Sequence, residues 1–144
     1  MVQYAPTKTG NQPMEVEPIG FADVLPFARD ARKEQVSFAN PNGAEWYGIR
    51  MDGKLVSFFC LVVGRKSARF KSNYTVPEMR RRGCLAAFIR FAIQRCIRAR
   101  VPVLTAFCTA SSVRSHVAHG AYPCGKTRNG VTFVRYTLLK RRAV

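Results

Sequence analysis

The pattern of apolar and polar residues marks three strand-sized segments in the first half of the chain. The segments are residues 45–51, 54–63 and 68–76, and turn residues separate them. Asp52-Gly53, between the first two segments, is typical of a two-residue hairpin turn. Residues 68–76 alternate with the period of two that is typical of a strand with one side toward a core, and Leu55 to Val63 is an apolar run of strand length, interrupted only by Ser57. The pattern therefore predicts an antiparallel meander of three strands.

The hydrophobic period changes to three and four residues between positions 83 and 100. Apolar side chains fall on one face there and arginines mostly on the other, which predicts an amphipathic helix against a sheet. The apolar run at residues 101–108 is typical of a buried strand. Ser111 or Ser112 can cap a short helix that ends near Gly120. Residues 122–126 and 131–139 then predict a hairpin.

The N-terminal part carries weaker signals. Residues 14–17 fit a short strand, and Asp23 can cap a helix that runs to about Gln35, with Pro26 tolerated in its first turn. A chain of 144 residues with 47% apolar content is large enough for one core. We expect one α/β domain over residues 14–139, after a flexible lead-in at residues 1–13 and before a basic tail at residues 140–144.

The charge of the chain is strongly asymmetric. There are 24 Lys and Arg against eight Asp and Glu, which makes a net charge of +16. Every acid lies at or before Glu78, so residues 79–144 carry 14 basic side chains and no acid. Such a field repels itself unless an anionic partner is near. We expect nucleic acid as that partner, and a basic surface that serves only solubility is the alternative.

The cysteines and histidines give no metal pattern. The five cysteines are spaced by twelve residues or more, and four lie in apolar runs, where a reduced cysteine packs as a small core residue. We expect neither a disulfide framework nor a metal site. The first 20 residues lack the apolar stretch of a signal peptide, and no segment is long enough to span a membrane. These features favour a cytoplasmic protein, in the host cytoplasm if it is viral, and they leave a homodimer open.

The loop before the long helix has the chemistry of an anion site. Arg80, Arg81 and Arg82 precede Gly83 at the start of the helix. The first N–H groups of a helix lack intrahelical acceptors, and the helix dipole adds positive potential there. Gly83 lets the backbone approach an anion, and arginines add charge-assisted hydrogen bonds. The loop suits a phosphate group, and a solvated basic turn is the alternative.

Residues 75–86 resemble motif A of the GCN5-related N-acetyltransferases, in which a strand ends in V-x-P and R-x-x-G-x-[GA] opens a helix. Pro77, Arg80 and Gly83 have the spacing of that motif, whereas Thr75 stands for the usual valine and Leu85 for a small residue. The order of elements is similar over nearly the whole chain. The resemblance implies a single α+β domain with a mixed, mostly antiparallel sheet and flanking helices.

The resemblance also implies an acyltransferase that uses acetyl-CoA or another acyl-CoA. A substrate amine would attack the thioester directly, and a backbone N–H near the end of the third meander strand would stabilise the negative charge on the carbonyl oxygen. The implied cofactor-binding residues are Thr75, Val76, Arg80, Arg81, Arg82, Gly83, Cys84 and Leu85.

A proton for the leaving thiolate is the next requirement of this chemistry. The family takes it from a tyrosine four residues before a Gly-Phe pair. Gly120-Ala121 stands at that pair here, so His116 replaces the tyrosine, and a histidine can donate a proton near neutral pH. Tyr74 and Tyr122 are the other candidate donors. A helix position without a catalytic role is the alternative for His116.

An acceptor site is expected at the start of the meander. Glu45, Trp46 and Tyr47 lie there, and together with Ser111 and Ser112 they form the predicted substrate-binding set. Trp46 and Tyr47 could stack on a planar base, although aromatic residues at a strand start also commonly belong to a core. No carboxylate on the third strand is available as a general base.

The scale, basicity and fold also resemble the Mom-type proteins of bacteriophages, which modify adenine in DNA. This resemblance implies a nucleic-acid acceptor, DNA in the first place, whose base would be flipped out of the duplex. The alternatives are an N-acetyltransferase for a protein or small amine and a non-catalytic nucleic-acid-binding protein on the same scaffold, which Leu85 would allow. The predicted nucleic-acid contacts are Arg95, Arg98, Arg114, Lys126 and Arg128.

Overall fold

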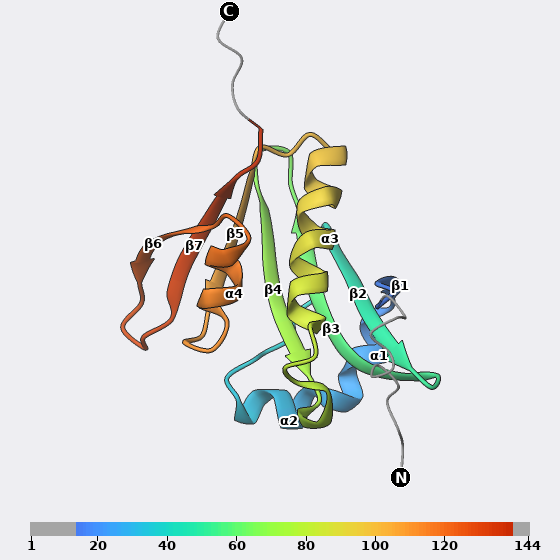
Figure 1. The fold of residues 1–144 in the computed structure, drawn as a ribbon. Helices are drawn as coiled ribbons and strands as arrows, with labels where there is room; N and C mark the ends of the chain where they lie inside the picture. Colours follow the sequence, from blue (N-terminus) through green and yellow to red (C-terminus); the bar gives the residue numbers. More distant parts are fainter. Residues whose placement is uncertain (1–13, 140–144) are drawn as a thin grey trace, which may run out of the picture.

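The computed structural model describes residues 14–139, which form a seven-stranded sheet in the order β1-β2-β3-β4-β5-β7-β6 (Figure 1). Neighbouring strands are antiparallel except β4 and β5, which are parallel. The mixed, mostly antiparallel sheet confirms the predicted fold class. The strands are β1 (Glu17–Ile19), β2 (Ala44–Met51), β3 (Lys54–Val63), β4 (Ala68–Thr75), β5 (Val103–Cys108), β6 (Tyr122–Lys126) and β7 (Thr132–Thr137).

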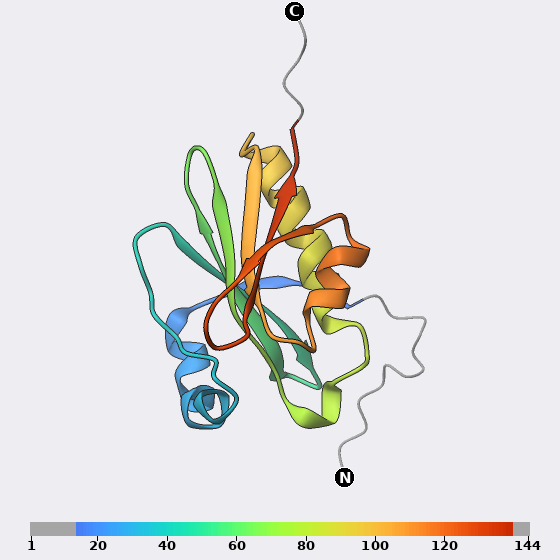
Figure 2. The same ribbon diagram turned by 90° about the vertical axis from the view of Figure 1, so that its left-hand side faces the viewer.

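Helices flank the sheet on both sides. The long helix α3 (Cys84–Arg98) and the short α4 (Val113–Ala118) lie on one face. The other face is covered at one end by α1 (Phe21–Val24), the 3-10 turn η2 (Leu25–Phe27) and α2 (Ala28–Lys33) (Figure 2). A second 3-10 turn, η3 (Pro77–Met79), connects β4 toward α3.

The N-terminal helix differs from its prediction. It is broken into α1, η2 and α2, because Pro26 lies inside η2 and cannot donate a backbone hydrogen bond. Asp23 is the third residue of α1 rather than its cap, and its carboxylate accepts a hydrogen bond from the Gly20 N–H at 2.8 Å. The first strand also begins at Glu17, later than the sequence suggested.

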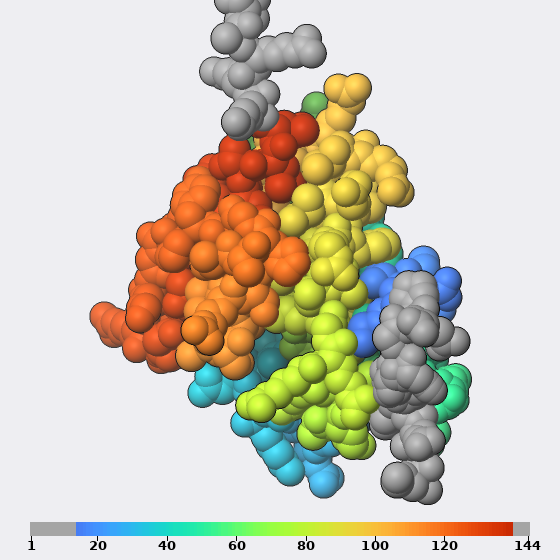
Figure 3. All heavy atoms as spheres, viewed as in Figure 1, coloured from blue at the N-terminus to red at the C-terminus, as the bar shows by residue number. Residues whose placement is uncertain are grey.

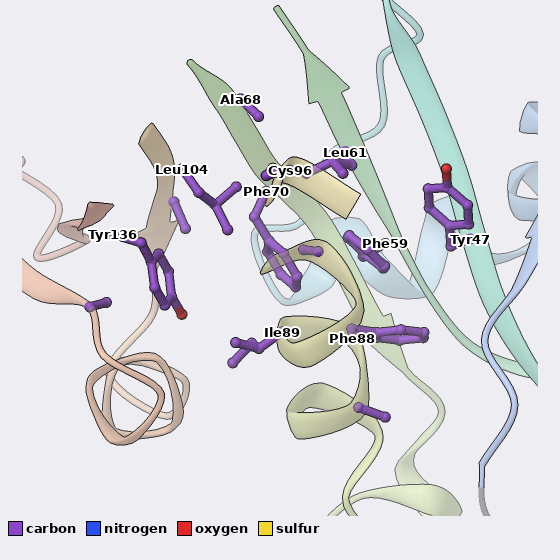
Figure 4. Packing of buried hydrophobic residues seen from close by; sticks show 14 of the residues in the cluster. Tyr47, Phe59, Leu61, Ala68, Phe70, Phe88, Ile89, Cys96, Leu104 and Tyr136 are labelled. Carbon is purple, nitrogen blue, oxygen red and sulfur yellow. The ribbon is translucent and has the colours of Figure 1, made fainter. Parts of the chain in front are cut away.

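The main hydrophobic core lies between the sheet and the apolar face of α3 (Figure 4). Phe59 is its centre: its ring stacks on Phe70 with centroids 4.5 Å apart and lies 4.8 Å from the ring of Phe88. A second core on the opposite face joins Trp46, Phe58 and Tyr74 to α1, η2 and α2. Four of the five cysteines are buried as free thiols, as the sequence predicted.

Two predicted segments, the lead-in at residues 1–13 and the tail at residues 140–144, lie outside the described residues. Among residues 14–139, no helix is both long and apolar enough to cross a membrane. Over the same residues, no three His, Cys, Asp or Glu side chains gather closely enough to hold a metal ion.

Candidate active site

The parallel strands β4 and β5 separate partway along their length. They pair only through residues 68–70 of β4 and 104–106 of β5. Beyond that point β4 continues to Thr75 and β5 to Cys108. The sheet therefore opens between the two strands, as Figure 1 shows, and the second half of β4 has no strand partner on that side among the described elements.

A bulge in β4 explains the separation. Phe58 of β3 pairs with Tyr74 and Cys60 pairs with Lys71, so two steps along β3 correspond to three along β4. Ser72 takes the extra place with a left-handed φ of 57°, and its hydroxyl donates to the Ser37 carbonyl at 2.8 Å. A bulge bends and twists its strand, which turns the end of β4 away from β5.

The loop after β4 leads into the N-terminus of α3. Gly83 precedes the helix with a φ of 93°, and the first turn has neither a capping side chain nor an acidic residue. A Cβ at Gly83 would meet no atom within 4 Å, so the backbone is open to a ligand there. Arg81 and Arg82 are exposed beside it. Free N–H groups, the helix dipole and two arginines together fit a phosphate or diphosphate.

Arg80, the third arginine of the predicted site, is engaged with protein groups. Its guanidinium donates to both carboxylate oxygens of Glu34 at 2.8 Å and to the Thr75 carbonyl at 2.9 Å. It also lies 5.6 Å from the centre of the Tyr74 ring. Arg80 thus ties the end of β4 to the turn after α2, whereas Arg81 and Arg82 have no ion-pair partner among residues 14–139.

The two predicted backbone donors at the end of β4 differ in availability. The Val76 N–H donates to the Val56 carbonyl at 2.9 Å, so it is already used within the sheet. Successive N–H groups of a strand point to opposite edges, which directs the Thr75 N–H toward the opening. The Thr75 carbonyl points to the same edge, where it accepts the bond from Arg80. Of these two N–H groups, the one of Thr75 is therefore the one that is not used within the sheet.

Cys84 and Leu85 belong partly to the core. Cys84 is 3% exposed, and burial raises the pKa of its thiol, so the sulfur is neutral at pH 7. The Leu85 side chain packs against the main core. Leu85 can therefore contribute its backbone N–H, in the first turn of α3, to an anion site. This N–H is present even though the leucine side chain is larger than the small residue usual in the family.

His116 lies over the point where β4 and β5 part. Its ring meets the ring of Phe70, the last paired residue of β4, edge-on at 5.1 Å. It is 2% exposed, and its Nδ1 shares a 2.5 Å hydrogen bond with the Tyr136 hydroxyl of β7. Burial, with a smaller contribution from His119, lowers the pKa of His116 to about 4. The imidazole is therefore neutral at pH 7 and can donate a hydrogen bond, but it carries no extra proton.

The other predicted proton donors lie elsewhere. Tyr74 is buried in the second core, on the opposite face of the sheet from His116. Tyr122 is on the edge strand β6, 47% exposed, and its hydroxyl lies 3.3 Å from that of Thr137. The structure therefore does not bring the three predicted donors together, and of the three only His116 is near the opening.

Ser111 and Ser112 lie between β5 and α4, across the opening from the start of α3. Both hydroxyls are within hydrogen-bond distance of the Thr109 hydroxyl, at 3.0 Å and 3.3 Å. The space-filling view is hollowed between this part of the chain, in orange, and the loop before α3, in yellow-green (Figure 3). The segment that joins β5 to α4, to which the two serines belong, thus borders this hollow opposite the loop before α3.

The remaining predicted substrate residues lie at the far edge of the sheet. Trp46 is 5% exposed and donates from Nε1 to the Asn40 side chain at 3.0 Å. Glu45 accepts hydrogen bonds from the Tyr47 hydroxyl at 2.6 Å and from Arg95 at 2.7 Å. Although burial alone would raise the pKa of Glu45, these bonds lower it below its ordinary value. The three residues line a surface hollow of about 340 Å³ beside β1, apart from the β4–β5 opening.

The predicted nucleic-acid contacts belong to three parts of the fold, α3, α4 and the β6–β7 hairpin. Arg95 is paired with Glu45, which neutralises its charge. Arg98 is near the end of α3 and Arg114 is on α4, whereas Lys126 and Arg128 belong to the β6–β7 hairpin. Helix α4 contacts both α3 and the β6–β7 hairpin, and Figure 1 shows it between them.

Sequence reasoning missed two features of the site. The bulge has only a faint signal, a break in the alternation where Lys71, Ser72 and Asn73 follow each other as polar residues. The pairing of Tyr136 with His116 has no local signal, because 20 residues separate the partners.

Solved structures of N-acetyltransferases share this architecture. The ribosomal-protein-S18-alanine N-acetyltransferase of Escherichia coli matches with a TM-score of 0.75 at 11% identity, over 90% of this chain and 97% of that chain. A protein of Klebsiella pneumoniae assigned as an acyl-CoA N-acyltransferase matches with a TM-score of 0.72 at 15% identity, over 90% and 100%. A GNAT family acetyltransferase of Elizabethkingia anophelis, solved with acetyl-CoA bound, matches with 0.68 at 12%, over 89% and 100%.

No protein-family model matches the sequence, and neither does any curated protein. The structural likeness covers nearly the whole domain, so the chain has the fold of the GCN5-related N-acetyltransferases. None of the three matched proteins is described as acting on DNA.

Proposed function

We propose that the protein is an N-acyltransferase that uses an acyl-CoA. The observation that carries this proposal is the opening between β4 and β5, bordered by the uncapped N-terminus of α3. The fold supports it, because one solved neighbour with this architecture holds acetyl-CoA. When bound, the coenzyme would supply an activated acyl thioester.

The residues of this chain have distinct parts in holding such a molecule. The N–H groups around Gly83, with Arg81 and Arg82, would bind the diphosphate. The free edge of β4 would hydrogen-bond an extended chain that carries amides, as one strand pairs with another. The Thr75 N–H would stabilise negative charge on an acyl oxygen at that edge.

His116 would act as a neutral imidazole. With the Tyr136 hydroxyl donating to Nδ1, the ring carries its proton on Nε2 and can direct that N–H toward a leaving sulfur. A neutral imidazole is a much weaker acid than an imidazolium, so we propose that it orients and stabilises the leaving group more than it protonates it. Replacing His116 by Phe would then lower kcat more than it raises KM.

Nucleic acid is our proposed acceptor class, and modification of a DNA base, as in the Mom-type proteins, is its most specific form. The support is the charge: 14 basic side chains and no acid follow Glu78. A coenzyme would neutralise only a few of them. Acylation of a protein amine is the second candidate, because the Escherichia coli neighbour is named for a ribosomal-protein alanine.

The proposal is tested first by binding. Acetyl-CoA should raise the unfolding temperature at moderate salt, and an Arg81→Ala/Arg82→Ala variant should need more of it for the same shift. Arg90→Ala/Arg98→Ala on α3 is the control with the same change of charge. If acetyl-CoA does not stabilise the wild-type protein, the acyltransferase proposal fails and a nucleic-acid-binding protein on this fold is the remaining candidate.

Mass spectrometry of nucleosides from cells that express the chain then tests the acceptor, because a new adenine derivative would identify DNA modification.

A further inference from the structure

We propose that the open face of strands β4, β5, β7 and β6, opposite α3 and α4, binds single-stranded nucleic acid. Unpaired bases would stack on Phe107 and Phe133, and Arg69 and Arg135 would contact the backbone phosphates. The proposal rests on the proposed function in one respect only, that the partner is a nucleic acid. It does not depend on acyl transfer.

Strand register places these side chains together. Cross-strand partners share a face, so Arg69 of β4, Thr105 of β5, Arg135 of β7 and Tyr122 of β6 form one row across the sheet. The next row pairs Phe107 of β5 with Phe133 of β7. The alternate residues of β5 and β7, Leu104, Ala106, Val134 and Tyr136, are all buried in the core beneath α3 and α4.

The aromatic row is accessible to solvent, with Phe107 exposed and Phe133 partly exposed. Phe107 is 59% exposed, more than any other exposed large apolar side chain of residues 14–139. Its ring centroid is 4.9 Å from that of Phe133, and the rings are tilted by 46°. The exposed side chains of Arg69, Phe107, Arg135 and Tyr122 show that no described element covers this part of the face, whereas the Tyr74 end of β4 lies beneath η2 and α2. Two adjacent rings on a strand pair form a platform for planar ligands, and every base has a π-face.

The charge of the face complements phosphate. No strand of the four contains an acidic residue. The three ion pairs among the described residues use Arg50, Arg80 and Arg95, none of which lies on this face. Lys126 and Arg128 continue the positive charge at the β6–β7 end, and Arg65 and Lys66 continue it at the β3–β4 turn. A strand of nucleic acid could therefore follow basic groups across the whole face.

Single-stranded nucleic acid fits better than the other occupants. Aromatic rings stack on bases only where the bases are unpaired, and an open four-stranded sheet with aromatic side chains typically stacks two or three. A second copy of the chain related by two-fold symmetry would present the same face, so arginines would meet arginines. The basic surroundings of the two phenylalanines therefore favour a polyanion with planar groups.

Fluorescence anisotropy with a labelled 15-nucleotide DNA, the same RNA sequence and the matching DNA duplex would test this surface. Phe107→Ala should weaken binding to the single strands about tenfold and leave duplex binding nearly unchanged, and Phe107→Trp should restore it. Ile97→Ala, an exposed apolar position on α3, is the control. A preference between the DNA and RNA strands would identify the biological form of the ligand.

The charge contribution is tested separately. Arg69→Gln/Arg135→Gln should reduce the slope of log affinity against log salt by about 1.4, because two phosphate contacts are lost. Arg90→Gln on α3 combined with Arg100→Gln just after it removes the same charge from another surface and should change the slope less, since both side chains are exposed there.

Three outcomes would overturn the proposal. If single strands bind equally well to wild type, Phe107→Ala and the α3 controls, another surface binds nucleic acid. If Phe107→Ala changes the oligomeric state in light scattering and leaves the affinity unchanged, the face joins two copies of the chain. If the wild type binds no nucleic acid but still binds acetyl-CoA, both this inference and the nucleic-acid acceptor fail, while the acyltransferase proposal stands.

Discussion

At the scale of single residues, His116 shows how a local motif acquires its chemistry from distant neighbours. Its position before Gly120 suggested a proton donor near neutral pH, whereas its surroundings are Phe70 and Tyr136. Removal from water favours the neutral ring, and the pKa falls to about 4.

This burial predicts a pH dependence of stability. Between pH 6.5 and about 4 the unfolded chain binds a proton at His116 that the folded protein excludes. The contribution of the neutral ring to the free energy of unfolding is therefore fully present above pH 6.5 and is lost as the pH falls. The loss reaches about 2 kcal/mol at pH 5. Chemical denaturation at pH 7 and pH 5 should show a smaller loss in His116→Gln than in wild type. His119→Gln, on the same segment and partly exposed, is the control. Equal losses in wild type and His116→Gln would contradict a buried neutral ring.

Arg80 is a second residue whose assignment changes in the fold. It bonds to Glu34 and Thr75, so we expect it to hold the loop in place and not to bind phosphate directly. Arg80→Ala and Glu34→Ala should then weaken acetyl-CoA binding to a similar extent, because each breaks the same link. Either change should cost at most about 1 kcal/mol of stability, since both side chains are partly exposed. A loss of affinity in Arg80→Ala alone would indicate a direct phosphate contact.

At the scale of elements, the bulge in β4 and the start of α3 together make the candidate site. The bulge at Ser72 separates β4 from β5, and the turn at Gly83 exposes the first N–H groups of the helix. Neither element alone offers both an unpaired strand edge and uncapped helical N–H groups. The site exists because one loop of the chain joins the two.

Substitution of Gly83 tests the helix start. Its φ of 93° is strained for any side chain, so Gly83→Ala should cost about 1 kcal/mol and also weaken acetyl-CoA binding. Gly53→Ala is a matched control, because Gly53 also has a positive φ, of 78°, and open space around it, in the β2–β3 hairpin. We expect the melting temperature to fall by a similar amount in both variants. Calorimetry should show weaker acetyl-CoA binding only in Gly83→Ala. A similar loss of affinity in both would mean that strain alone changes binding.

At the scale of the whole molecule, the net charge of +16 is distributed over several surfaces. Among residues 14–139, three arginines are paired with carboxylates, and the others that the sequence had grouped together lie on different elements. The fold also brings Arg69, from the more balanced half of the chain, into the same cross-strand row as Arg135, with Thr105 between them.

A salt titration tests whether this charge binds a polyanion. With about five phosphate contacts, affinity for a single strand should fall about a hundredfold between 50 and 200 mM salt. Acetyl-CoA has few phosphates, so its affinity should change much less over the same range. Anisotropy and calorimetry would measure the two. Nucleic-acid binding that is insensitive to salt would contradict a phosphate-contacting surface.

Local patterns determined most of the elements. The apolar run within residues 54–63 predicted β3 with its observed bounds, and Asp52-Gly53 forms the expected hairpin with φ values of 52° and 78°. The three-and-four period predicted α3 to within two residues at each end. These features depend on neighbours in sequence, because period and turn chemistry act over a few residues. The same reasoning failed at Asp23 and Pro26, where one helix became three short turns.

The sequence by itself therefore determined the order of the elements, the fold class, the basic loop before α3 and the excess of positive charge. Tertiary structure alone decided that β4 leaves β5, that Arg80 and Arg95 are occupied by Glu34 and Glu45, and that His116 is neutral beside Tyr136. It also decided that Phe107 and Phe133 share an open basic face. The physical reason is distance along the chain: these contacts join residues that are 20 to 50 positions apart, and only the packed sheet brings them together.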